Sequence, residues 1–114
     1  MTMRVFVYGT LKMGRRNNGL LAAATYIGEA KTEPKYTMYS VGYFPYVTEG
    51  GQQTIQGEIF DVDEATLNEL DALENHPAWY ERKVVQTSLG EAWMYIMPPI
   101  HNIIGTEVKS GNWR

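Results

Sequence analysis

The sequence contains no cysteine among its 114 residues. Disulfide bonds, thiolate metal sites, iron–sulfur clusters and a cysteine nucleophile are therefore excluded. No apolar run approaches the ~20 residues that a membrane-spanning helix needs. The N-terminus also lacks the long apolar core and the small-residue cleavage site of a signal peptide. We therefore expect a cytoplasmic protein that has no membrane partner.

A concentrated positive charge is also missing. The chain has 10 Lys and Arg residues against 13 Asp and Glu residues, which gives a net charge of −3. Nucleic-acid-binding domains usually carry a basic surface, so we expect no nucleic-acid partner. The stretch from Tyr36 through Glu81 contains nine acidic residues and no Lys or Arg. Solvated faces of several elements explain this stretch, and an acidic protein-interaction surface is the alternative.

The size and composition predict a single domain that covers residues 1–114. Apolar residues make up 44% of the chain and charged residues 20%, close to the averages of globular domains, which argues against intrinsic disorder. Trp113 predicts a C-terminal tail that docks on the domain. The sequence does not indicate an oligomeric state.

The pattern of apolar residues predicts many strands and few helices. One helix is expected to begin at the N-cap Asp63 and to end near Glu74. A shorter helix over residues 20–24 would be capped by Asn17 or Asn18. Strands are expected at residues 3–8, 25–32, 36–41, 44–48, 54–62, 80–87 and 92–97. These elements predict an α+β fold with a mostly antiparallel or mixed sheet, which closes into a small barrel with one or two helices outside.

A carboxyl group lies on the apolar face of the expected helix. Glu74 follows Leu67 and Leu70 at helical spacing, so the three side chains share one stripe. Burial raises the pKa of a carboxyl group and suits it to exchange protons near neutral pH. The alternative is a solvent-exposed Glu74 at a frayed helix end. Asp71, at the flank of the stripe, is expected to pair with Arg82 or with a backbone amide.

A glycine turn follows the first expected strand, in the order Tyr8, Gly9, Thr10 and Leu11. Glycine lets the backbone turn sharply and lets a ligand approach the main chain. Successive amide groups in such a turn can bind a carboxylate or a developing oxyanion. An ordinary structural turn is the alternative.

The remaining candidates are basic side chains and histidines. Lys12, Arg15 and Arg16 follow the glycine turn, where they either attract a carboxylate-bearing ligand or remain solvated. His76 and His101 do not have the spacing of metal ligands, so we expect no metal site.

Two segments in this order resemble the gamma-glutamylcyclotransferase-like family. The first is Val-Phe-Val-Tyr-Gly-Thr-Leu-Lys-Met-Gly at residues 5–14, and its Tyr-Gly-Thr-Leu-Lys variant is similar to gamma-glutamylaminecyclotransferases. The second is Leu-Asp-Ala-Leu-Glu at residues 70–74, followed by Pro77, Tyr80 and Arg82. Residues 44–46 and 56–63 also match in order and type, so the resemblance extends to about residue 85.

This resemblance implies a small mixed β-barrel around a cavity. It also implies a cofactor-independent enzyme without a metal, which acts on a small-molecule γ-glutamyl substrate. The α-amine of the substrate would attack its own γ-carbonyl and release 5-oxoproline and a free amine. Carried over by position, Glu74 is the catalytic acid and base. The substrate-binding loop is carried over onto Tyr8, Gly9, Thr10 and Leu11.

One departure from the family pattern follows the glutamate. Asn75 and His76 stand where many members have glycine or another small residue, which affects the expected shape of the cavity rim. A non-catalytic module that binds a small carboxylate or a peptide end in the same cavity is the alternative function.

Overall fold

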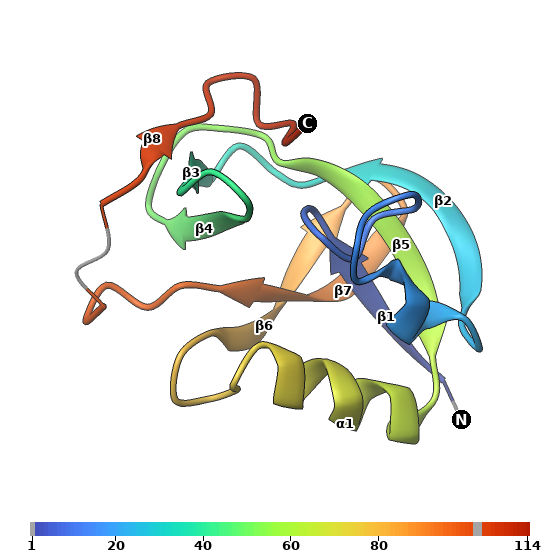
Figure 1. Ribbon diagram of the computed structural model, residues 1–114. Coiled ribbons are helices and arrows are strands. Elements are labelled where there is room, and N and C mark those ends of the chain that lie inside the picture. The colour runs from blue at the N-terminus through green and yellow to red at the C-terminus, as the bar shows by residue number, and fades with distance from the viewer. Residues whose placement is uncertain (1, 102–103) are drawn as a thin grey trace.

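The computed structural model describes residues 2–101 and 104–114 (Figure 1). Within these residues the chain forms eight strands, one α-helix and one 3₁₀ helix. In chain order they are β1 (Met3–Val7), η1 (Asn18–Leu21), β2 (Thr25–Lys31), β3 (Tyr36–Ser40), β4 (Pro45–Glu49), β5 (Gln56–Val62), α1 (Glu64–Leu73), β6 (Glu81–Thr87), β7 (Gly90–Ile96) and β8 (Thr106–Glu107).

The strands form two sheets. A five-stranded sheet has the order β2-β5-β1-β7-β6, and a three-stranded sheet has the order β4-β3-β8. The central strand β1 pairs antiparallel with β5 and parallel with β7, so the larger sheet is mixed. The predicted α+β class is confirmed, and all seven predicted strands are present with ends within two residues of the prediction. The two-residue strand β8 was not predicted, because Thr106 and Glu107 carry no apolar pattern.

The prediction that the sheet closes into a barrel is wrong. A barrel requires a continuous hydrogen-bonded ladder between its first and last strands. In the described residues, the edge strands β2 and β6 meet at their ends through one isolated bridge, between Thr32 and Thr87. Beside it, the amide of Ser88 donates to the carbonyl of Lys31 at 2.9 Å. The edges are close at one point but do not pair along their length, so the sheet stays open.

Helix α1 begins and ends as its sequence predicts. The side chain of Asp63 accepts a hydrogen bond from the amide of Thr66 at 2.7 Å, as an N-cap residue does. The last helical residue is Leu73, and Glu74 is the C-cap. No helix in the described part of the chain is long and apolar enough to cross a membrane.

The larger sheet is covered on both faces, as Figure 1 shows for α1 on one side and the smaller sheet on the other. Alternate residues of β1 therefore point into two cores. Val5 and Val7 pack with Leu67 and Leu70 of α1 in the first core. The second core includes Phe6, Tyr8, Met38, Val47, Ile59 and Met94. Burial on both sides fixes the position of β1 and of the turn that follows it.

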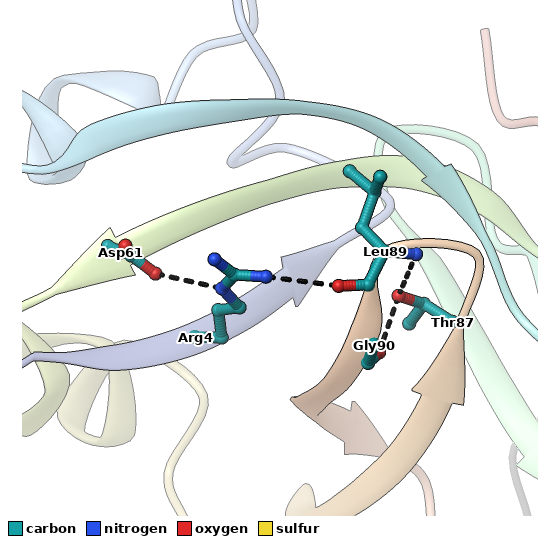
Figure 2. A network of polar contacts seen from close by, with 5 residues as sticks. All are labelled: Arg4, Asp61, Thr87, Leu89 and Gly90. Atoms are coloured by element: carbon teal, nitrogen blue, oxygen red, sulfur yellow. Dashed lines mark hydrogen bonds and ion pairs between the residues drawn. The ribbon is translucent and has the colours of Figure 1, made fainter.

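A polar network ties β1 to two neighbouring elements (Figure 2). The guanidinium of Arg4 contacts the carboxylate of Asp61 on β5 at 3.3 Å and donates to the carbonyl of Leu89 at 3.0 Å. The Thr87 hydroxyl donates to the carbonyl of Gly90 at 2.7 Å and accepts from the amide of Leu89 at 3.1 Å. These bonds hold the turn between β6 and β7 against the central strand.

The segment between β1 and β2 differs from its prediction. The expected helix over residues 20–24 is a 3₁₀ helix at Asn18–Leu21, and no side chain caps it. The two asparagines bond to the preceding turn instead. Asn17 Nδ2 donates to Thr10 Oγ1 at 2.8 Å, and Asn18 Nδ2 donates to the carbonyl of Leu11 at 2.9 Å. Asparagine can satisfy either arrangement, and here its side chains fasten the turn rather than the helix.

Candidate active site

A cavity of about 260 Å³ lies between the turn after β1 and the C-terminal end of α1. Every residue that was predicted for the site lines this cavity: Tyr8, Gly9, Thr10, Leu11 and Glu74. The turn is positioned by the buried strand β1, and the carboxyl group is positioned by the end of a helix that packs on the same sheet. The fold thus brings together two segments that are far apart in the sequence.

Glu74 contributes the single acidic side chain of the described cavity lining. Its backbone is fixed, since its amide donates to the carbonyl of Leu70 at 2.9 Å and its carbonyl accepts from the amide of Tyr80 at 3.3 Å. The described residues provide no hydrogen bond or ion pair to its carboxyl group. Burial raises the pKa of Glu74 from 4.5 to about 7. A carboxyl group with this pKa can accept and return a proton near neutral pH.

The chain turns sharply after Glu74 through a residue in the left-handed region. Asn75 has a φ of 52°, a conformation that glycine adopts readily and that asparagine tolerates better than most residues. Its carbonyl accepts from the amide of Trp79 at 2.8 Å, and the amide of His76 donates to the carbonyl of Asp71 at 2.9 Å. Asn75 thus supplies the backbone geometry for which a glycine would otherwise be used.

The turn after β1 presents unused backbone donors. In the described part of the chain, the amide groups of Gly9, Thr10 and Leu11 donate no hydrogen bond, while the carbonyl of Gly9 accepts from the amide of Lys12 at 3.1 Å. Successive free amides are a common binding site for carboxylates and oxyanions. The turn is therefore suited to hold a negatively charged part of a ligand.

Three tyrosines line the cavity, and each hydroxyl donates to an acceptor of the protein. Tyr8 donates to the carbonyl of Tyr95 at 2.7 Å, and Tyr80 donates to the carbonyl of Pro45 at 3.1 Å. Tyr95 donates to a carboxylate oxygen of Asp71 at 2.6 Å. Burial raises the pKa of all three phenols, so they remain protonated at neutral pH. The three rings shape the cavity wall. Because their hydroxyl groups donate elsewhere, none of them donates a hydrogen bond to the carboxyl group of Glu74.

Asp71 forms the pair that the sequence predicted for it. Its two oxygens contact Arg82 at 2.8 and 3.2 Å, and the guanidinium also lies 4.5 Å from the centroid of the Trp93 ring. Burial raises the pKa of Asp71, but hydrogen bonds from Arg82 and Tyr95 outweigh it and hold that pKa below its usual value. Asp71 is therefore a charged, structural neighbour of the cavity wall.

The three basic residues after the turn lie in different places. Arg16 lines the cavity. Lys12 is buried, and its ammonium group donates to the carbonyl of Trp113 at 2.7 Å. Arg15 lies over the Trp113 ring, 5.1 Å from its centroid. Of the two alternatives for these residues, attraction of a ligand to one site by all three does not fit the structure, because Lys12 and Arg15 contact the C-terminal tail. The predicted docking of that tail is confirmed.

Several further residues of the cavity wall were not assigned to the site from sequence. Leu73 is the last residue of α1, Trp79 lies in the segment between α1 and β6, and Tyr95 comes from β7. Leu73 precedes the predicted base by one position, which marks it as a neighbour in the helix end. For Tyr95 the sequence carries no such signal, because its place depends on strand pairing.

A family model described as "Gamma-glutamyl cyclotransferase, AIG2-like" matches residues 5–114 of this chain. The gamma-glutamylcyclotransferase family protein YtfP of Citrobacter rodentium is 39% identical over 112 residues, which cover 97% of this chain and 95% of that protein.

Solved structures show the same fold. The solution structure of YtfP from Escherichia coli has a TM-score of 0.71 and 38% identity, and the match covers 97% of this chain and 96% of that one. A crystal structure of a protein from Pyrococcus horikoshii has a TM-score of 0.83 and 29% identity, with 96% and 88% covered.

Proposed function

Because the chain belongs to the gamma-glutamyl cyclotransferase, AIG2-like family, we propose that it cleaves a γ-glutamyl amide and releases 5-oxoproline and a free amine. One observation carries this proposal. The carboxyl group of Glu74, which has no hydrogen-bond partner among the described residues, shares a cavity with the free amides of residues 9–11. The first group is suited to proton transfer, and the second is suited to bind negative charge.

The reaction needs only groups of the substrate and of this chain. The α-amine nitrogen of the substrate attacks its own γ-carbonyl carbon and forms the five-membered ring. Glu74 takes a proton from the attacking nitrogen and gives it to the leaving nitrogen, and the original carbon–nitrogen bond breaks. Atoms and charge balance without an oxidant or a co-reactant. Such proton transfer is worth roughly 10²–10⁴-fold in rate.

The turn after β1 supplies binding and orientation. Free amides of Gly9, Thr10 and Leu11 hold the glutamyl carboxylate or the oxygen of the attacked carbonyl. The open substrate chain is flexible, and a cavity that binds it in a curled form brings amine and carbonyl together. Well-oriented intramolecular reactions reach effective molarities of about 10⁵ M or more. Orientation therefore contributes at least as much as the proton transfer does.

The Glu74→Gln variant tests this proposal, since it keeps the shape of the side chain and removes the exchangeable proton. We expect 5-oxoproline formation from γ-glutamyl amines and γ-glutamyl amino acids to fall by about 10²–10⁴-fold. Binding of 5-oxoproline, measured by calorimetry, should change little. Glu69→Gln is the matched control, because Glu69 is exposed on the same helix.

Two outcomes would count against the proposal. A Glu74→Gln variant that retains most of the activity would show that Glu74 is not the base. A wild-type protein that forms no 5-oxoproline from either substrate class, yet is stabilised against heat by 5-oxoproline, would be a binding module that uses the same cavity.

A further inference from the structure

The cavity has a buried floor and an exposed rim. Leu11 and Tyr80 on the floor are 4% and 7% exposed, whereas Leu73 and Trp79 on the rim are 42% and 36% exposed. The volume of about 260 Å³ is below the roughly 300–1,000 Å³ of typical small-molecule sites. We therefore place the glutamyl part of a substrate on the floor and the leaving amine at the rim.

Arg16 is the one basic residue of the described cavity lining. Its guanidinium carbon lies 5.6 Å from the centroid of the Tyr43 ring. Stacking on an aromatic face orients a guanidinium and leaves the N–H donors in its plane available. Within the described residues, Arg16 has no hydrogen bond or ion pair that would occupy those donors. An oriented cation with unused donors thus stands where the leaving group is expected.

The two classes of leaving group, amino acids and alkylamines, differ in the charge that they would place at the cavity rim near Arg16. An amino acid carries a carboxylate on the carbon next to its amine, and an alkylamine does not. The glutamyl part has its own carboxylate, for which the free amides of Gly9, Thr10 and Leu11 are available on the floor. A second carboxylate would therefore meet Arg16 at the rim.

Resting on the function proposed above, we propose that Arg16 binds the α-carboxylate of a leaving amino acid, so that γ-glutamyl amino acids are preferred over γ-glutamyl alkylamines. A guanidinium matches a carboxylate with two parallel hydrogen bonds. Leu73 and Trp79, which form the apolar part of the rim, favour an apolar side chain on that amino acid. The substrate class is thus γ-glutamyl amino acids such as γ-glutamyl-leucine.

A pair of matched substrates tests the role of Arg16. γ-Glutamyl-leucine and γ-glutamyl-3-methylbutylamine differ only in the carboxylate of the leaving group. In Arg16→Gln, kcat/KM for γ-glutamyl-leucine should fall about tenfold, and kcat/KM for the amine should stay within about twofold. Arg15→Gln is the control, because Arg15 stacks on Trp113 away from the cavity lining and should leave both values unchanged.

A binding measurement separates this inference from the proposed function. Both ligands are titrated by calorimetry into Glu74→Gln and into the double variant that also carries Arg16→Gln, so no turnover is needed. If the wild type forms no 5-oxoproline, the proposed function fails, but a roughly tenfold weaker binding of γ-glutamyl-leucine alone still supports the carboxylate site. Equal losses for the two ligands, or no loss for either, would overturn the assignment of Arg16.

Discussion

Gly9 packs so closely against Pro45 that a Cβ atom placed on it would lie 2.7 Å from Cγ and 2.9 Å from Cδ of the proline ring. Both residues line the cavity, and Pro45 begins β4 of the smaller sheet. The proline ring is rigid and its residue is buried, so neither partner can move away easily. The contact thus fixes the turn that offers free amides against the adjoining part of the cavity wall that Pro45 forms.

Gly9→Ala should therefore damage both stability and activity. We expect the free energy of unfolding to fall by about 1–3 kcal/mol, as for other overpacked sites, and 5-oxoproline formation to fall with it because the turn is displaced. Urea denaturation and the product assay measure the two effects. Gly19→Ala is the control, since nothing lies within 4 Å of a Cβ placed there. If Gly9→Ala changes neither the free energy of unfolding nor 5-oxoproline formation, Pro45 and its neighbours can move to accommodate the added methyl group.

The rate should depend on pH through the Glu74 carboxyl group. Burial raises its pKa to about 7, and the proposed base must be deprotonated. We expect kcat/KM for a γ-glutamyl substrate to rise about tenfold per pH unit below pH 7 and to level off above it. Initial rates of 5-oxoproline formation between pH 5 and pH 8 measure this profile. A profile that is flat down to pH 5 would rule out Glu74 as the base.

Stability should change over the same pH range in the opposite direction to the rate. The pKa of Glu74 is about 7 in the folded protein and near 4.5 when it is unfolded, so the folded state binds more protons between these values. The protonated Glu74 carboxyl group therefore stabilises the folded state fully below pH 4.5, and this stabilisation is lost as the pH rises through 7. Compared with Glu74→Gln, the wild type should lose about 3 kcal/mol of unfolding free energy between pH 4.5 and pH 8. Parallel urea denaturation series of the two proteins measure the difference, which would vanish if the carboxyl group were well hydrated.

Tyr95→Phe should affect stability more than activity. The variant loses the 2.6 Å hydrogen bond from the Tyr95 hydroxyl to Asp71 but keeps the ring in the cavity wall. Since Asp71 still pairs with Arg82, we expect a loss of about 0.5–1.5 kcal/mol in unfolding free energy and a change in kcat within about threefold. A collapse of kcat in a variant that folds normally would instead make this hydroxyl part of the reaction.

Local sequence patterns were enough to predict most helices and strands and both parts of the candidate site, the carboxyl group at the helix end and the glycine turn. The stripe of Leu67, Leu70 and Glu74 follows directly from helical periodicity, and the glycine turn follows directly from the end of a strand. The Asp71–Arg82 pair was also predictable, because Arg82 lies only 11 residues after Asp71, at the start of the strand that follows the helix. Each of these features depends on neighbours that are close in the sequence.

Features that depend on distant partners were not accessible in the same way. Arg15 and Arg16 are adjacent in sequence, yet one stacks on Trp113 and the other on Tyr43, so only the folded chain shows which of them reaches the cavity. The open sheet is a similar case. Whether the edge strands pair along their length depends on the twist of five strands, and no single strand carries a signature of it.

The division of the cavity into floor and rim separates two tasks in the chain. In the proposed function, proton exchange and capture of negative charge are assigned to Glu74 and the turn at residues 9–11, which are fixed by a buried strand and a packed helix. The same proposal assigns discrimination among leaving amines to exposed side chains such as Arg16 and Trp79, which belong to neither buried core. Substitutions at the rim can therefore diversify the amine that is released while the underlying chemistry stays intact.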